Sequence, residues 1–182
     1  MIGKTEVTQE QWKAVMGSNP SGFKCGNLPV ENVSWDDCQE FIKELNNLTE
    51  LNFRLLTEAE WEYAARGGNK SKGYKYSGSD NINDVAWSFD NTSGSGGTRS
   101  VATKKANELG LYDMSGNVRE WCSDCYVEYS SLLKIDKTER LRRVRRGGCV
   151  FDGARWCRVS SRAWSEINTS CNQMGLRLAH SL

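Results

Sequence analysis

The sequence predicts a mixed domain of a few helices, small strands and much irregular loop. Three segments begin with a hydroxyl residue that can cap a helix and carry a polar side chain three residues later. The segments between and after them are rich in Gly, Asn and Ser and hold only short apolar runs. At 182 residues the chain can bury one core without disulfides or metal ions, so we predict a single domain over residues 1–182.

Three helices are predicted from these caps. The pairs of capping hydroxyl and polar partner are Thr8 with Gln11, Ser34 with Asp37, and Thr57 with Glu60. Gly17 should end the first helix, and Gly67 with Gly68 the third, because glycine takes the left-handed conformation at a helix end at low cost.

Each longer helix carries an apolar face that should lie in the core. On the second helix the apolar residues recur at three- and four-residue spacing: Trp35, Cys38, Phe41, Ile42 and Leu45. On the third helix the corresponding group is Ala59, Trp61, Tyr63 and Ala64. We interpret both groups as core and not as a cofactor site.

Strand signals are weaker and shorter than the helix signals. Residues 5–8 and 99–103 have strand-like composition. Residues 106–124 are dense in turn residues, and Gly116 and Asn117 can take positive φ there. We expect a rigid, buried turn that leads into a strand.

Charge and cysteine content exclude several classes of partner. A formal net charge of +1 gives no overall field for nucleic acid or an acidic membrane surface, and no apolar run is long enough for membrane insertion. The first residues lack the apolar stretch of a signal peptide, and the seven cysteines are an odd number without a repeated framework. Mostly free thiols are therefore expected. Localisation is left open, and a bacterial or phage surface protein is expected if the chain is part of a longer one.

Two local motifs have alternative interpretations. The basic run 137–148 is better explained as a solvated strand flank than as a nucleic-acid patch, although Arg145 and Arg146 could instead be tied into a core turn.

Cys122 and Cys125 form a lone C-x2-C pair, and zinc sites normally need a second pair. We favour Cys122 as a core residue and leave the zinc site as the alternative.

Five segments resemble the formylglycine-generating enzyme and sulfatase-modifying factor family, in the family's order and over nearly the whole chain. They are GKTEVTQEQWKAVMGSNPSGF, PVENVSWDDCQEFIKELN, FRLLTEAEWEYAARGG, NELGLYDMSGNVREWCSD, and RRVRRGG with the later CRVSSR and GLRLA. This resemblance implies an α+β domain with a C-type lectin-like fold, in which two main helices pack against small antiparallel sheets. The activity has to be judged from the site and not from the fold.

The resemblance also identifies where a catalytic site would lie. Enzymes of this family bind copper through two cysteines with the spacing C-x4-C, which suits soft Cu(I). Here the first of those positions is Asp152, and only Cys157 remains, while Cys149 stands where the family has a structural serine. A related branch holds iron with several histidines, but His180 is the only histidine of this chain. We therefore expect no copper, no iron and no catalysis.

A calcium site is the one cofactor that the resemblance suggests. The matching ligand positions are Asp113, Gly116, Val118 and Glu120, where the glycine and valine would offer backbone carbonyls. Hard oxygen ligands of this kind suit Ca²⁺. The alternative, equally weighted, is that Glu120 hydrogen-bonds the turn without a metal ion.

The C-terminal stretch resembles the variable region of proteins that diversity-generating retroelements mutate at adenines. Residues 149–174 keep family-like framework positions but diverge between them, and most of the divergent residues are types that adenine changes in Asn codons reach. Trp156, Trp164 and Glu166 need other starting codons. We predict a ligand-binding surface made by Val150, Phe151, Asp152, Gly153, Trp156, Ser161, Ala163, Trp164, Ser165, Glu166, Ile167, Asn168, Thr169, Ser170 and Asn172.

The sequence thus favours a non-catalytic domain that recognises a protein or glycan surface. Rigid aromatic residues among small polar ones are typical of binding surfaces, although Trp156 could instead be buried. The first alternative is a formylglycine-generating oxidase with Cys149 and Cys157 as an unconventional pair. The second is a purely structural domain of a larger cell-surface or phage protein. The ligand and the oligomeric state are not predicted.

Overall fold

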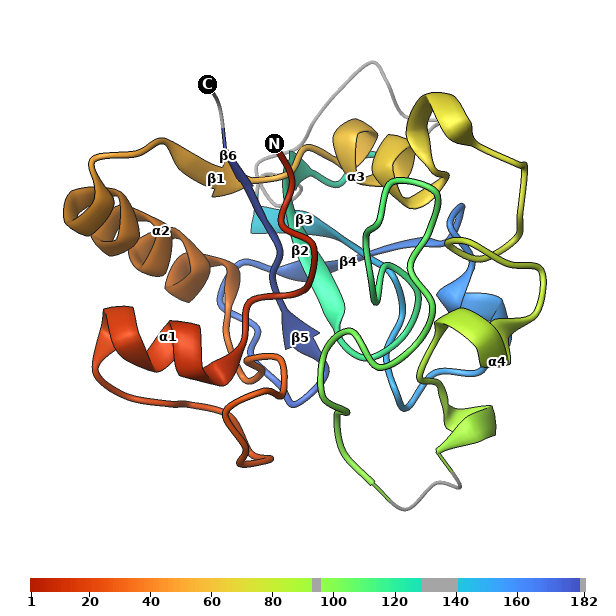
Figure 1. Cartoon of the computed structure of the whole chain (residues 1–182). Helices are drawn as coiled ribbons and strands as arrows, with labels where there is room; N and C mark the ends of the chain where they lie inside the picture. The colour runs from red at the N-terminus through yellow and green to blue at the C-terminus, as the bar shows by residue number, and fades with distance from the viewer. Residues whose placement is uncertain (93–95, 129–140, 181–182) are drawn as a thin grey trace.

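A computed structural model describes residues 1–92, 96–128 and 141–180 (Figure 1). Its α-helices are α1 (Gln9–Met16), α2 (Trp35–Thr49), α3 (Glu58–Ala65) and α4 (Ile82–Val85). Its strands are β1 (Phe53–Leu55), β2 (Arg119–Cys125), β3 (Arg142–Arg146), β4 (Arg162–Glu166), β5 (Met174–Gly175) and β6 (Leu178–His180). Short 3-10 turns include η1 (Gly68–Lys70), η2 (Phe89–Asn91) and η4 (Ala154–Cys157).

The three predicted helix starts are confirmed. Each helix opens with a capping box, in which the hydroxyl oxygen accepts from the amide three residues on and the polar side chain accepts from the capping residue's amide. At the end of α1, Gly17 has φ of 74° and its N–H donates to the Lys13 carbonyl. Local hydrogen bonds therefore determine where these helices begin, which is why the sequence alone could place them.

Two short runs that the sequence predicted as strands are not strands. Residues 5–8 form no ladder and take part only in an isolated bridge between Thr8 and Pro29, although the Val7 amide donates to Leu176. Residues 99–103 form turn and loop. The Asp113 carboxylate binds the Ala102 amide at 2.7 Å, so a side chain takes the place that a neighbouring strand would have.

The buried face of α3 also differs from the expectation. Tyr63 is 58% exposed and Ala59 is exposed, whereas Trp61, Ala64 and Ala65 are completely buried. The buried positions are thus spaced three and four residues apart starting from Trp61. The predicted core role is correct for Trp61 and Ala64 and wrong for Ala59 and Tyr63.

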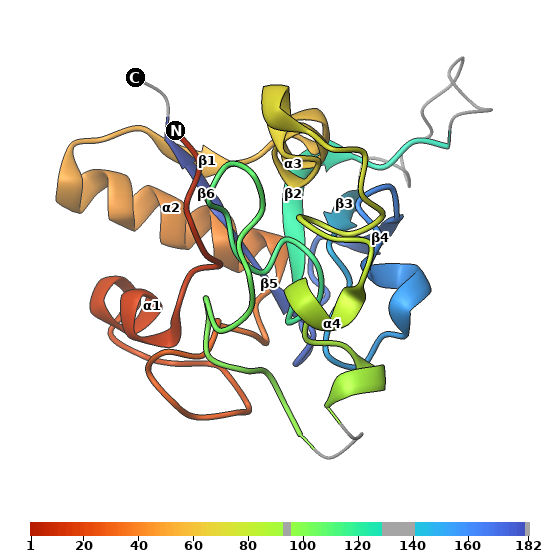
Figure 2. The ribbon, with the colours of Figure 1, turned by 45° about the vertical axis from the view of Figure 1, so that its right-hand side comes forward.

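Two small sheets organise the chain. The larger has the strand order β4-β3-β2-β5, and the smaller pairs β1 with β6. All pairings are antiparallel except β2 with β5, which is parallel. Figures 1 and 2 show α1 and α2 together on one side of the sheets. Helix α3 lies apart from them, close to β2 and β3. The expected mixture of few helices, small sheets and much loop is confirmed.

Strand β2 separates two apolar clusters. Trp121 packs in a cluster with Trp12 and Phe41 of α1 and α2, while Cys122 packs with Trp61 of α3 and with Val144. Neighbouring side chains of a strand point to opposite faces, so these two residues serve two cores. The prediction that Cys122 is a core residue is confirmed, since it is fully buried.

The basic run is not a solvated flank. Within it, β3 lies between β2 and β4, so it is a central strand. Arg146 is 1% exposed and forms ion pairs with Glu58 and Glu62 of α3. The alternative interpretation, in which this arginine is tied into the core, is therefore the correct one; residues 137–140 of the run lie outside the described residues.

A buried ion pair connects the two ends of the chain to the centre. Arg177 and Glu120 are 0% and 1% exposed, and the Glu120 carboxylate also accepts from the Trp61 indole at 2.6 Å. The Arg177 guanidinium donates in addition to the carbonyls of Gly3 and Tyr112. The positive charge of Arg177 is thus balanced by Glu120, and its nitrogens donate hydrogen bonds to groups inside the protein.

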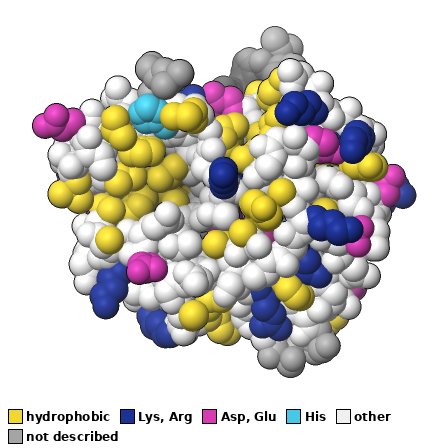
Figure 3. Space-filling view, in the orientation of Figure 1, with side chains coloured by type: hydrophobic (Ala, Val, Ile, Leu, Met, Phe, Trp, Pro, Cys, Tyr) yellow, Lys and Arg dark blue, Asp and Glu magenta, His cyan; other side chains and the backbone are white. Residues whose placement is uncertain are grey.

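An apolar area lies on the face of the molecule that carries the histidine. Figure 3 shows apolar side chains gathered beside the single histidine, where Ile2, Leu51, Phe53 and Leu178 line a shallow hollow with His180. In the described part of the chain, no helix is both long enough and apolar enough to cross a membrane.

Replacing Arg177 by Met should strongly destabilise the fold. Glu120 would keep a buried negative charge without its cation, and such a loss typically costs about 3–5 kcal/mol. Urea denaturation of the wild type and Arg177→Met measures this cost. The double variant with Glu120→Gln should recover part of it, and a loss below about 1 kcal/mol in the single variant would contradict the assigned role.

The ion pair between Arg54 and Glu60 should make stability depend on acid pH. Hydrogen bonds from the Arg54 guanidinium lower the pKa of Glu60 to about 2, against the opposing effect of partial burial, whereas the ordinary value is 4.5. A lowered carboxyl pKa stabilises the folded state above the unfolded pKa, and this contribution disappears as pH falls from about 4.5 to about 2.

The measurement compares the wild type with Glu60→Gln by urea denaturation between neutral pH and the lowest pH at which both fold. The wild type should be more stable at neutral pH, by no more than about 1 kcal/mol because both side chains are partly exposed, and the difference should shrink with acidity. Glu40→Gln, which removes an exposed carboxylate on α2, is the control. A difference that stays constant with pH would contradict this assignment.

Candidate ligand-binding site

A glycine turn after β3 shapes the candidate site. Gly147 and Gly148 have φ of 93° and 71°, which favour glycine. A Cβ added at Gly148 would lie 2.9 Å from both the Cys157 Sγ and the Trp156 carbonyl oxygen. The chain between β3 and η4 can therefore turn this tightly only because residue 148 has no side chain.

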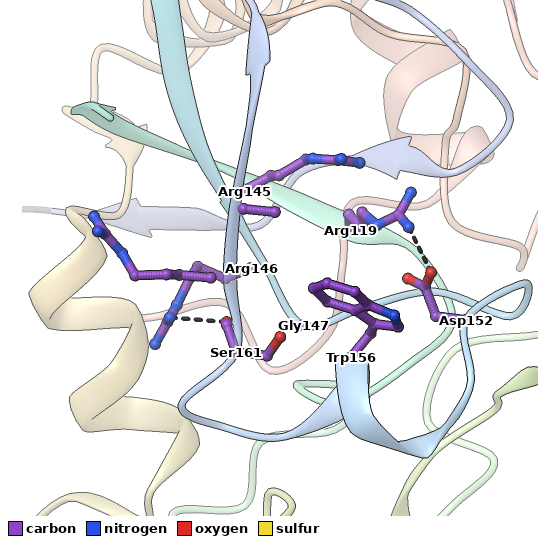
Figure 4. Close-up of a pocket in the computed structure, with 10 residues that line it drawn as sticks. Arg119, Arg145, Arg146, Gly147, Asp152, Trp156 and Ser161 are labelled. Atoms are coloured by element: carbon purple, nitrogen blue, oxygen red, sulfur yellow. Dashed lines mark hydrogen bonds and ion pairs between the residues drawn. The ribbon is translucent and has the colours of Figure 1, made fainter. Parts of the chain in front are cut away.

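A cavity of about 260 Å³ opens between this turn, β2, β3, η4 and the start of β4 (Figure 4). Its walls combine four arginines with one acidic, one aromatic and several small residues. They are Arg119, Arg145, Arg146, Gly147, Gly148, Asp152, Trp156, Ser161, Arg162 and Ala163. A positively charged hollow of this size fits one side chain or a similarly small group.

Asp152 is held in place on one wall of the cavity. One carboxylate oxygen accepts from the Arg119 guanidinium at 2.5 Å, and the other accepts from the Cys149 amide at 3.0 Å. Arg119 also donates to Gln173. These contacts join the loop after β3 to strand β2 and to the loop before β5, so this wall of the cavity is rigid.

Two of the cavity's arginines form ion pairs with α3. Arg162 binds Glu58 through two nitrogens at 2.8 and 2.7 Å. Arg146 pairs with Glu58 and Glu62 and donates to the carbonyl of Val159 at 2.9 Å. Their charges are therefore compensated by carboxylates that lie outside the cavity.

Three aromatic side chains of the C-terminal region reach the surface. Phe151, Trp156 and Trp164 are 36%, 49% and 37% exposed. The Arg142 guanidinium lies 4.1 Å from the Trp164 ring centre, and Arg155 lies 5.5 Å from that of Trp156. The question left open for Trp156 is thus answered, since its ring lies at the mouth of the cavity and not in the core.

The structure divides the predicted binding residues into groups. Asp152, Trp156, Ser161 and Ala163 line the cavity. Exposed or half-buried positions away from its lining are Phe151, Gly153, Trp164, Ser165, Glu166, Ile167, Asn168, Thr169, Ser170 and Asn172. The second stretch runs beside the start of α2, because the Ile167 carbonyl accepts from the Trp35 amide at 3.0 Å.

Val150 does not belong to this surface. It is 1% exposed, and its amide donates to the Asn117 carbonyl in the turn before β2. Its assignment to a ligand surface is corrected here: an apolar side chain directly after the buried Cys149 continues the core. Asp152 is itself only 9% exposed, so its carboxylate shapes the cavity more than it faces solvent.

The sequence interpretation missed Arg119, Arg145 and Arg162 as cavity residues. In β3, Arg143 and Arg145 share one face of the strand, and the opposite face carries Val144 and Arg146. The run RRVRR has charged residues on both faces and neither alternates nor forms an apolar run, so it gave no local signal of a central strand. The approach of Arg119 to this face depends on pairing with a distant strand, for which no local signal exists.

The thiols near the cavity are not in a reactive state. Cys149 and Cys157 are both fully buried. Burial raises the pKa of Cys149 to about 12 and also raises the pKa of Cys157. Thiols with such pKa values stay protonated at neutral pH, whereas nucleophilic or metal-binding cysteines act as thiolates.

The predicted calcium ligands lie together but are engaged in other contacts. Both oxygens of Glu120 accept from Arg177, and one also accepts from Trp61. One oxygen of Asp113 binds the Ala102 amide, and the other is buried without a hydrogen bond. Burial raises the pKa of Asp113. This arrangement favours the metal-free alternative for Glu120, and calcium binding stays a prediction.

Within the described ranges, no three His, Cys, Asp or Glu side chains form a group that could hold a metal ion. For the C-x2-C pair, Cys122 lies in the core, while Cys125 is half-buried and contacts Arg143. The described geometry therefore gives no support to the zinc alternative.

Comparison with known proteins assigns the chain to a family. A match to the sulfatase-modifying factor enzyme 1-like domain extends over residues 1–182. The chain belongs to this family. The resemblance found in the sequence motifs is thereby confirmed.

The curated relatives of this chain include both a protein named as a chaperone and proteins named as enzymes. The chain is 35% identical over 228 residues to the chaperone protein LppX of Paenibacillus barcinonensis, covering 99% of this chain and 79% of the relative. It is 31% identical over 193 residues to the formylglycine-generating enzyme of Mus musculus, covering 95% and 50%. The chain thus spans about half the length of the mouse enzyme.

A solved structure also matches the fold. Treponema denticola variable protein 1 superposes with a TM-score of 0.86 at 32% sequence identity, covering 97% of this chain and 82% of that one. The predicted α+β fold of the formylglycine-generating-enzyme type, and its likeness to a variable protein, are both confirmed.

Proposed function

We propose that this chain is a non-catalytic ligand-binding domain, and that its binding surface is formed by the described residues between 151 and 172 around the cavity. The observation that carries the proposal is the position of Asp152. Where the family's enzymes have the first copper-binding cysteine, this chain has a carboxylate engaged with Arg119 and the Cys149 amide.

The state of the two cysteines supports the same proposal. A copper site needs two thiolates that can approach one ion. Cys149 and Cys157 are buried, their pKa values are raised by burial, and no other cysteine has the family's spacing to either. The oxidase alternative would require both thiols to lose their protons inside an apolar environment.

The exposed aromatic residues support a recognition role. Trp and Arg are enriched at binding hot spots because they offer large contact areas with few rotatable bonds or fixed hydrogen-bonding geometry. Here Trp156 lines an arginine-lined cavity, and Phe151 and Trp164 of the same C-terminal region are also exposed. Likeness to a variable protein agrees with this role. Under this proposal the target is a protein or glycan surface.

Copper(I) binding by the reduced protein tests the non-catalytic part. A chromogenic chelator should outcompete the wild type and Cys157→Ser equally, because the wild type has no cysteine pair with the C-x4-C spacing. Asp152→Cys, which restores the C-x4-C spacing, should bind Cu(I) more tightly than either. Tight one-to-one binding by the wild type that is lost in Cys157→Ser would overturn the proposal.

Selection of ligands tests the recognition part. Ligands found for the wild type on a glycan array or in a displayed peptide library should bind Trp156→Ala and Trp164→Ala at least about tenfold more weakly, because truncated hot spots cost about 2 kcal/mol or more. Tyr63→Ala, which truncates a 58% exposed aromatic residue on α3, is the matched control. Equal binding by all variants would contradict the location of the surface.

Diversification by a retroelement has a separate test in the genome. A near-copy of the DNA for residues 145–178, differing at adenines and lying beside a reverse transcriptase gene, is expected. Its absence would remove the retroelement from the proposal and leave the binding surface in place.

A further inference from the structure

On the side of the cavity formed by Arg119 and Arg145, positive charges outnumber negative ones. Arg146 and Arg162 each form an ion pair with a carboxylate of α3, Glu58 or Glu62, and Glu62 also pairs with Arg66 at the surface. Arg119 and Arg145 are left with a single carboxylate on the cavity wall, that of Asp152. The pair of arginines therefore carries one positive charge more than its surroundings neutralise.

Arg145 is the arginine with the excess charge. Its Nε donates to the Trp164 carbonyl at 3.0 Å, and one terminal nitrogen lies 3.7 Å from the Met174 sulfur. Among the described residues it forms no ion pair. A carbonyl and a thioether are weak partners for a guanidinium, whose planar fork matches a carboxylate.

The environment of Arg145 makes this imbalance costly. Burial lowers the pKa of the Arg145 guanidinium, and the neighbouring charge of Arg119 lowers it further, while Asp152 opposes both effects. A cation held near a like charge in a half-buried site is stabilised when an anion enters. The cavity beside it has room for such a group.

We propose that the cavity accepts an acidic side chain of a protein ligand, whose carboxylate pairs with Arg145 beside Arg119 while Trp156 covers its methylene groups. This inference rests on the proposed function and specifies the ligand of the same site. The cavity volume of about 260 Å³ suits one Asp or Glu side chain. Arginine and tryptophan around a small hollow are the composition of a protein hot spot.

Binding of a small probe tests the inference without a known ligand. N-acetyl-glutamate amide is titrated into the isotope-labelled protein at low salt, and the shifts of the Arg145 Nε–H, the Arg119 Nε–H and the Trp156 indole N–H are followed by NMR. Saturable shifts of these three signals are expected. N-acetyl-glutamine amide, which has the same shape without the charge, should produce shifts at least about tenfold weaker.

Variants assign the effect to Arg145. Arg145→Gln should weaken binding of the acidic probe at least about tenfold, and Arg145→Lys should retain part of it, since lysine keeps the charge without the fork. Arg158→Gln, which removes an exposed arginine that does not line the cavity, should bind the probe like the wild type. Thermal melting of each variant shows whether the fold is kept.

Three results would overturn the inference: equal shifts with the glutamine probe, unchanged binding by a folded Arg145→Gln, or binding of glucuronate but not of the glutamate probe. The last would assign the cavity to an acidic sugar. These failures are distinct from failure of the proposed function, which would appear as tight copper binding or as selected ligands indifferent to Trp156 and Trp164.

Discussion

The structure depends on one buried ion pair, Arg177 with Glu120. Removing two charges from water costs several kcal/mol for each ion, and this cost is offset only when geometry and hydrogen bonding are nearly complete. Here the guanidinium reaches Glu120, the Gly3 carbonyl and the Tyr112 carbonyl, while Trp61 donates to the same carboxylate. Arg177 therefore connects the start of the chain with the turn before β2, and Glu120 connects the same pair to helix α3.

Two further acidic residues, Glu6 and Asp113, lie near this pair, so the positive charge of Arg177 is needed to offset more than one carboxylate. Burial raises the pKa of Glu6 well above its ordinary value, and the charges of Asp113 and Glu120 raise it further. Glu6 accepts from the Asn117 side chain and from the Val118 amide, so it fixes the turn from the other side. Burial and the nearby carboxylates favour the protonated form of Glu6, although the charge of Arg177 acts in the opposite direction.

This rigid centre separates the framework from the recognition surface. Gly147, Gly148, Cys157 and Arg177 are buried or backbone-constrained, so a change there would alter the core. Phe151, Trp156 and Trp164 are each more than one third exposed to solvent. Under the proposed function, residues at the surface can therefore vary while the stability of the domain is set elsewhere.

Sequence reasoning succeeded where the determinants are local. A capping box needs residues only three positions apart, and positive φ at Gly116 and Asn117 follows from residue type, because glycine lacks a Cβ and asparagine has a short polar side chain. The failures depend on distant partners: the Asp113 carboxylate keeps residues 99–103 out of a strand, and the burial of Val150 depends on the turn at Asn117. The convergence of Arg119 and Arg145 could not be predicted, because it requires the register between β2, β3 and β5.

Under the proposed function, the side chain at position 152 decides what the site can bind. A thiolate pair would bind a soft metal ion, whereas a carboxylate binds Arg119 and a backbone amide and makes one wall of the cavity rigid. Asp152 forms its ion pair with Arg119, so Arg145 stays without an acidic partner among the described residues. Under the two proposals the carboxylate at position 152 makes the wall rigid and removes part of the positive charge, and the charge that remains on Arg145 is what attracts an anion.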